Sequence, residues 1–179
     1  TAQEQLEEMS KNKSSITGLP TGFYDLDKIT SGLHAGELII IAARPGMGKT
    51  AFALNIATNS SFQTDKAIAI FNLEMSAEQL VNRMISSVGQ IEREKLRTGM
   101  MNNNDWKKYN EAISQLADTN IYIEDNASIT APEIKAKCRR LANSEKGLGL
   151  VVIDYLQLVT TGGRTESRQV EVSDISRAF

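Results

Sequence analysis

The sequence predicts an α/β fold, in which a mostly parallel central sheet is flanked by helices and preceded by a short helix. Four apolar runs of strand length, at 37–42, 67–72, 121–123 and 150–153, alternate with longer segments whose apolar residues recur at helical spacing. The runs are apolar at consecutive positions, as in parallel strands that are covered on both faces. Because regular alternation of strands and helices joins parallel strands through helical crossovers, we expect an open sheet with helices packed on it.

The amino-terminal part is predicted to be a short helix followed by a turn-rich segment. The helix is expected within residues 1–13, where Leu6 and Met9 are its apolar contacts. Such a helix is too short to be stable alone in water, so it either frays or docks on another surface. Residues 16–22 are rich in turn-forming types, and a second short helix follows and ends at Ser31-Gly32.

The later helices are predicted from their capping residues and apolar spacing. One helix is expected at about 49–60, and the next begins at Ser76-Ala-Glu-Gln79, whose ends form a capping box. Asn104 or Asp105 opens a third helix. A fourth follows Thr130-Ala-Pro-Glu133, where Thr caps, Pro presets the first turn and Glu completes a second capping box.

Composition indicates a globular cytoplasmic protein. The chain has 179 residues, of which 41% are hydrophobic, and no apolar run approaches the length of a membrane span. Its single cysteine, Cys138, excludes an internal disulfide, fits a reducing compartment, and is expected to be a buried apolar residue of a helix. Twenty basic residues against twenty-two acidic ones exclude a wholly basic surface for nucleic acid, but they leave room for a local basic loop.

The strongest motif lies between the strand at 37–42 and the helix that follows. It reads Ala43, Arg44, Pro45, Gly46, Met47, Gly48, Lys49 and Thr50. Gly46 and Gly48 allow backbone N–H groups to converge on phosphate oxygens, and the start of the helix adds partial positive charge. Lys49 is expected to reach the β- and γ-phosphates and to assist catalysis, and the Thr50 hydroxyl to bind Mg²⁺.

This motif departs from the usual pattern at one position, because Ala43 stands where the first glycine is expected. The alternative interpretation is a chance turn containing Gly-Lys-Thr. The strand before the turn and the helix after it argue against chance. The motif therefore predicts a nucleotide site for ATP with Mg²⁺.

Two carboxylates are predicted to complete the site. Asp154 ends the strand at 150–153, where an aspartate can hold Mg²⁺ beside the phosphate-binding loop, although alone it could be a plain turn former. Glu74 comes just after the strand at 67–72, at the carboxyl edge where α/β sheets bind ligands. It could orient the attacking water as a catalytic base. The alternative for Glu74 is a helix-start carboxylate favoured by the helix dipole.

Arg164 and Arg168 lie in a polar, glycine-bearing loop after the fourth strand. Two arginines among glycines and hydroxyl groups can bind a phosphodiester backbone, which makes them candidate DNA-binding residues. The alternative is a solvated loop with no ligand.

The motifs together resemble the C-terminal motor domain of the DnaB family of bacterial replicative helicases. The resembling segments are ITGLPTGFYDLD at 16–27, AARPGMGKT at 42–50, FNLEMS at 71–76, VIDYLQL at 152–158, and the loop and helix start at 164–177. The missing first glycine is normal in that family, and Asn72 stands where serine is more usual. The resemblance covers 14–179 as a RecA-like P-loop ATPase domain, incomplete at its carboxyl end, with 1–13 as the linker helix.

This resemblance implies a homo-hexameric ring that binds and hydrolyses ATP at subunit interfaces. Such a ring translocates 5′ to 3′ on single-stranded DNA, unwinds the duplex at the replication fork, and has primase and a helicase loader as partners. In the family, a strand with a glutamine sensor and the basic residues that reach a neighbouring ATP site follow the position of Phe179. The isolated chain is therefore expected to bind nucleotide and hydrolyse it slowly, because a trans-acting arginine contributes about 10³–10⁵ in rate.

Two other functions stay open at this point. The chain could be another RecA-like ATPase, of the recombinase or clock type, or a non-catalytic module whose nucleotide state only gates assembly. The segments at 71–76 and 154–158 favour the helicase over the other ATPases.

Overall fold

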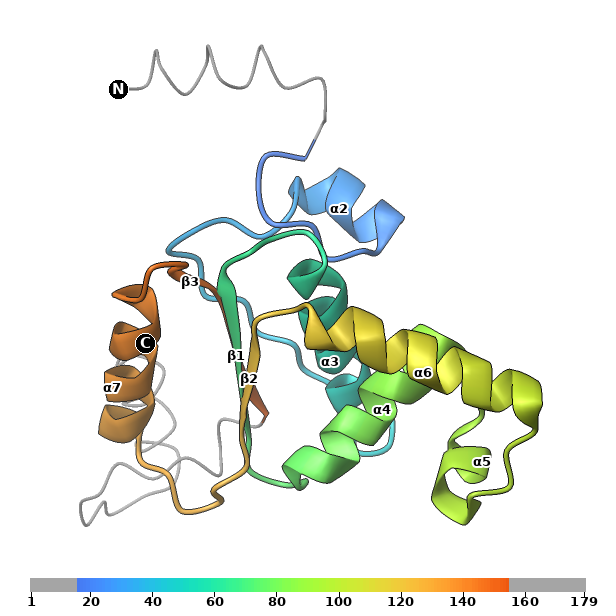
Figure 1. Cartoon of the computed structure of the whole chain (residues 1–179). Coiled ribbons are helices and arrows are strands. Elements are labelled where there is room, and N and C mark those ends of the chain that lie inside the picture. Colours follow the sequence, from blue (N-terminus) through green and yellow to red (C-terminus); the bar gives the residue numbers. More distant parts are fainter. Residues whose placement is uncertain (1–15, 155–179) are drawn as a thin grey trace.

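The computed structural model of the chain describes residues 16–154 (Figure 1). The linker helix expected within residues 1–13 and the loop with Arg164 and Arg168 lie outside the described residues. In chain order the described elements are α2 (Tyr24–Thr30), α3 (Lys49–Ser61), β1 (Ala67–Asn72), α4 (Ala77–Gly89), α5 (Arg93–Thr98), α6 (Asn103–Ala117), β2 (Ile121–Glu124), α7 (Ala131–Ala142) and β3 (Leu148–Asp154).

The sheet of the described region has three strands in the order β2-β1-β3, and both pairings are parallel. Ile70 of β1 pairs with Ile123 on one side and with Val152 on the other. At the carboxyl edge, Asn72 is the register partner of Asp154. The predicted parallel α/β arrangement is confirmed, and this register brings the end of β3 beside the end of β1.

Helices cover both faces of the sheet, with α7 on one side and α3, α4 and α6 on the other (Figure 1). Side chains of a strand alternate between faces, so β1 contributes to two cores. Ala69 and Phe71 pack with Ile134 of α7. Ile68 and Ile70 belong to the second core, which includes residues of α3 and α4. The central position of β1, with helices on both faces, therefore buries every one of its residues.

Capping residues place the helix starts where the sequence predicts them, with one small shift. Ser76 and Gln79 form the capping box of α4, and Glu133 accepts hydrogen bonds from the backbone N–H and hydroxyl of Thr130 before α7. Helix α6 begins earlier than expected, because Asn102 is its cap and bonds reciprocally with Asp105. The six-residue α5 was not predicted, and it has no buried residue that would give an apolar period.

The helices of residues 16–154 include none that is long and apolar enough to cross a lipid bilayer. Cys138 of α7 is half-buried against the core on that side of the sheet. Burial raises the pKa of its thiol, so the group stays protonated at neutral pH. Cys138 therefore packs as a small apolar residue of α7, although it is half-buried and not fully buried.

The segment before the phosphate-binding loop is anchored to the far end of α3. The buried Asp27 carboxylate of α2 accepts hydrogen bonds from the backbone N–H of Thr21 and of Gly22, at 2.8 and 3.1 Å, and from the Thr21 hydroxyl, at 2.7 Å. Asn59 of α3 donates to the Thr21 carbonyl. These bonds hold the leading segment against α3 and satisfy a buried charge.

The prediction of a strand at 37–42 is wrong for the described structure. These residues have an irregular backbone, and Leu38, Ile39 and Ile40 are 60%, 51% and 73% exposed. A strand requires ladder hydrogen bonds to a neighbour, and residues 16–154 supply no strand that pairs with this segment. Apolar composition alone therefore did not produce a strand here.

Candidate nucleotide-binding site

The turn at 45–48 leads directly into the first residue of α3, Lys49. Gly46 and Gly48 have φ values of 79° and 88°, in the left-handed region that side chains disfavour. A Cβ at either position would meet no heavy atom within 4 Å, so the two glycines border open space. The amino end of α3 directly follows this turn, and the partial positive charge of a helix start makes the region suited to a phosphate.

Asp154 brings the end of β3 to the start of α3. Its carboxylate accepts a hydrogen bond of 2.6 Å from the Thr50 hydroxyl. The Lys49 ammonium lies 3.3 Å from the other carboxylate oxygen. Asp154 is 4% exposed, so this contact between residues 104 positions apart is largely shielded from water. The structure therefore brings together three of the predicted site residues.

Asn72 is a site residue that sequence reasoning did not assign. Its side-chain amide donates to Asp154 over 3.2 Å, and its carbonyl oxygen accepts from the backbone N–H of Glu74, at 3.1 Å, and of Met75, at 2.6 Å. Asn72 is 1% exposed. A polar side chain at the end of an otherwise apolar strand was the available signal, because a buried amide needs partners.

Glu74 lies in the bend between β1 and α4, and it is exposed. Arg83 of α4 lies close enough to Glu74 and to Asp154 for both carboxylates to act on its charge. Burial lowers the pKa of Arg83, Arg93 lowers it further, and the two carboxylates raise it. Sequence reasoning did not single out Arg83, since an arginine within an amphipathic helix has no local signature of a site.

The residues at this edge fit a magnesium ion that arrives with phosphates. Thr50 and Asp154 offer a hydroxyl and a carboxylate oxygen, and Mg²⁺ in nucleotide sites takes few protein ligands besides phosphate and water. Residues 16–154 contain no group of three or more His, Cys, Asp or Glu side chains that could hold a metal by themselves. The donor set therefore suits a nucleotide-bound Mg²⁺ and not a protein-built metal cage.

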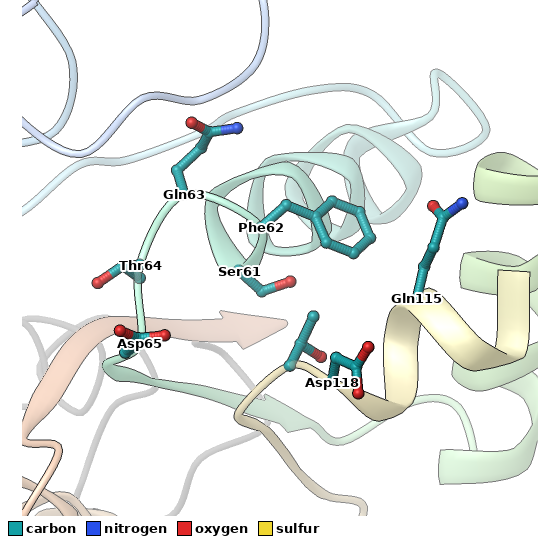
Figure 2. A pocket seen from close by; sticks show the side chains of 8 residues that line it. Ser61, Phe62, Gln63, Thr64, Asp65, Gln115 and Asp118 are labelled. Atoms are coloured by element: carbon teal, nitrogen blue, oxygen red, sulfur yellow. The ribbon is translucent and has the colours of Figure 1, made fainter.

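A separate surface hollow lies at the opposite end of α3. It is lined by residues 61–65 together with Gln115, Asp118 and Thr119. Figure 2 shows the loop after α3 facing the end of α6, with Asp65 and Asp118 among the lining side chains. Helix α3 spans about 20 Å, so the hollow is remote from Lys49. Its carboxylates disfavour a phosphate, and none of the predicted site residues lines it.

Comparisons with known proteins agree on one family. Residues 18–179 match the DnaB-like helicase C-terminal domain. The chain is 51% identical over 97% of its length to the replicative DNA helicase DnaC of Bacillus subtilis (strain 168). It is 52% identical over 98% of its length to the replicative DNA helicase DnaB of Geobacillus stearothermophilus.

Solved structures of similar proteins share the fold. A DnaB-like replicative helicase, described with its interactions with primase, superposes with a TM-score of 0.88 at 36% identity, over 98% of this chain and 42% of that one. A second solved structure, of an ATPase domain, superposes with a TM-score of 0.89 at 36% identity, over 99% of this chain and 65% of that one. The predicted RecA-like fold is thereby confirmed.

The chain spans 38% and 39% of the length of the Bacillus and Geobacillus relatives. The matched region includes the phosphate-binding loop, Asn72, Glu74 and Asp154. The fold, the paired ends of β1 and β3, and the family match agree with one another. The chain belongs to the DnaB-like helicase family, as a member of its C-terminal domain.

Proposed function

We propose that this chain is the motor domain of a ring-shaped replicative DNA helicase, which binds and hydrolyses ATP to move along DNA and unwind it. The observation that carries the proposal is the contact of Lys49 and Thr50 with the buried Asp154 beside an open glycine turn. A lysine, a hydroxyl and a carboxylate in that arrangement can bind a triphosphate with its magnesium.

Binding of the triphosphate uses the backbone and Lys49. The N–H groups of residues 46–48 and the start of α3 donate to phosphate oxygens, and Lys49 contacts the β- and γ-phosphates. Thr50 and Asp154 would hold Mg²⁺, which supplies positive charge to the phosphate oxygens. The bonds that Asp154 makes to Lys49 and Thr50 in the chain alone keep its carboxylate at this position.

Hydrolysis uses Glu74 as the base. Glu74 orients a water molecule and accepts a proton from it. The water oxygen bonds to the γ-phosphorus while the bond from that phosphorus to the β–γ bridging oxygen breaks, which leaves ADP and phosphate. Asn72 holds the peptide N–H groups of Glu74 and Met75 next to Asp154. The backbone that carries Glu74 is therefore tied to Asp154 through Asn72.

The wider assignments rest on the family. We propose a homo-hexamer in the cytoplasm with ATP at subunit interfaces, translocating 5′ to 3′ on single-stranded DNA, with Arg164 and Arg168 as DNA contacts. The solved DnaB-like replicative helicase is described with its interactions with primase, and we propose primase as a partner of this protein too, together with a helicase loader. The proposed units are a linker helix at 1–13 and a RecA-like domain at 14–179.

The decisive experiment is Glu74→Gln in the full-length protein that contains this chain. We expect MgATP binding to persist while ATP turnover falls by about 10²–10⁴, the usual contribution of a general base, and unwinding of forked DNA is lost. Glu78→Gln is the matched control, because Glu78 is an exposed carboxylate in the first turn of α4. Its turnover is expected to equal that of the parent protein.

The alternatives give different results in the same assay. Unwinding that survives Glu74→Gln would favour a non-catalytic assembly module. Strand exchange without unwinding by the parent protein would favour a recombinase.

The interface location of the site is tested separately by the isolated chain. We expect the 179-residue chain to bind MgATP and to turn it over slowly, because a neighbouring subunit supplies a cation worth about 10³–10⁵ in rate. Brisk, DNA-stimulated turnover by this chain would contradict the proposal that hydrolysis needs a neighbour.

A further inference from the structure

Residues 74–77 connect β1 to α4, and the backbone N–H group of each donates to a side chain. The first three donate to neighbours in the sequence, two of them to Asn72 and one to Gln79. The fourth acceptor is 48 positions away, because the Asp125 carboxylate accepts from the Ala77 N–H at 2.8 Å. Hydrogen bonds to successive N–H groups restrict the backbone of this connection, and Asp125 is the anchor that tertiary structure supplies.

The parallel register of the sheet places Asp125 beside this connection. Glu124, the last residue of β2, is the register partner of Phe71 in β1. Asp125 therefore leaves the sheet at the same edge as the connection from β1 to α4 (Figure 1). On the other side of β1, the Asn72 side chain donates to the end of β3. The connection from β1 to α4 is thus tied to both strands that flank β1.

The backbone on either side of Asp125 is fixed by contacts of its own. Before it, Glu124 accepts a hydrogen bond from Lys137 of α7. After it, Ile129 is 1% exposed and packs in the core that α7 covers. The Asp125 carboxylate also meets the amino end of α4, where partial positive charge favours an anion. Asp125 is therefore in place to accept from the start of α4 before any ligand arrives.

We propose that Asp125 is a positioning residue for ATP hydrolysis, which holds the backbone that carries Glu74 where this carboxylate can orient the attacking water. This inference rests on the proposed function, in which Glu74 is the base. Asp125 acts through the N–H of Ala77, three residues after Glu74, and touches neither the water nor the nucleotide. Without this bond the start of α4 loses its tie to β2. A general base works only within hydrogen-bond reach of the proton that it accepts, so a small displacement of Glu74 slows hydrolysis.

The first test removes the acceptor in the full-length protein that contains this chain. We expect Asp125→Ala to lower kcat for ATP about tenfold and to leave KM and MgATP affinity near the parent values, because a misplaced base slows the chemical step. Asp125→Asn should retain most of the turnover, since the amide keeps an accepting oxygen. Asp65→Ala is the matched control, because Asp65 is an exposed aspartate that precedes β1, at the opposite edge of the sheet.

A second variant removes the donor of the same hydrogen bond. Ala77 is the first residue of α4, and its cap Ser76 has φ and ψ values of −68° and 155°. Proline is favoured at the first position of a helix, and the residue before a proline adopts this extended conformation. Ala77→Pro therefore deletes the N–H group and keeps the helix, which makes it the test where Asp125→Ala does not fold. It should lower kcat as far as Asp125→Ala does, and the two changes together should lower it no further.

A double-mutant cycle tests whether Asp125 acts through Glu74. In the Glu74→Gln background, Asp125→Ala should lower the residual kcat no further, because the group that it positions is already gone. The inference is overturned by an unchanged kcat in Asp125→Ala or Ala77→Pro, by an equal loss in Asp125→Asn, or by a full additional loss in the Glu74→Gln background. A parent protein that does not hydrolyse ATP, or a Glu74→Gln protein that hydrolyses it at the parent rate, overturns the proposed function instead.

Discussion

Asn72→Asp changes one amide to a carboxylate of the same shape beside Asp154. The Asn72 amide nitrogen lies 3.2 Å from the Asp154 carboxylate, to which it donates. An ionised aspartate at residue 72 would remove this donor and put two negative charges at that separation. At an effective dielectric constant of about 20 the repulsion is about 5 kcal/mol. The backbone bonds that Asn72 accepts would survive, because aspartate keeps the accepting oxygen.

Protonation limits this penalty. Keeping one carboxyl of ordinary pKa protonated at pH 7 costs about 4 kcal/mol, and the protonated group can again donate to Asp154. Protonation of one carboxyl therefore costs less free energy than repulsion between two ionised carboxylates. We expect Asn72→Asp to lower the free energy of unfolding by about 3–4 kcal/mol at pH 7, a large share of the stability of a small domain.

The sign of the pH dependence follows from that proton. The shared pKa of the residue 72–Asp154 pair would be raised above the unfolded value of about 4, so the folded variant binds one more proton than the unfolded chain between the two values. Its stability relative to the parent chain should rise by about 1.4 kcal/mol for each pH unit as pH falls in that window. The difference in unfolding free energy between the parent chain and Asn72→Asp should then largely disappear near pH 4.

Urea unfolding of the parent chain and of Asn72→Asp at pH 7, 6 and 5 measures this effect. Asn110→Asp is the control, because Asn110 is an exposed asparagine on α6. The reasoning is refuted if the difference in unfolding free energy between Asn72→Asp and the parent does not change with pH, or if it matches that of the control.

Two further predictions follow from the local geometry. Gly48→Ala places a side chain at a φ of 88°, so we expect urea unfolding to show a free energy of unfolding lower by about 1–2 kcal/mol. Calorimetry should also show weaker MgATP binding, because the new Cβ borders the phosphate-binding turn. An unchanged affinity would contradict a phosphate site at this turn. The Asn102 backbone N–H and the Lys95 ammonium hold the pKa of the Asp105 carboxyl below its usual value, so its contribution to stability is present above about pH 4 and is lost as pH falls through the lowered pKa. Asp105→Asn should therefore flatten the acid side of the thermal stability curve between pH 5 and 2, and a slope equal to that of the parent chain would disprove this linkage.

Local signals in the sequence were enough for most elements. The apolar run at 67–72 and the capping pair Ser76 and Gln79 each depend on residues a few positions apart, and the structure has β1 and α4 where they indicate. The glycine turn before Lys49 is equally local, because its function follows from backbone conformation at neighbouring residues. The family match also agrees with what these short motifs indicate.

Tertiary structure decided how distant residues meet. The amide of Asn72 reaches Asp154 only because β1 and β3 are neighbours in register. The residues of either strand alone do not predict which strands lie next to each other in the sheet. Arg83 comes near Asp154 and Glu74 through the tertiary placement of α4, which the helical period of the sequence does not reveal. The irregular backbone at 37–42 has the same origin, since apolar residues specify burial whereas a strand also needs a neighbouring backbone to bond with.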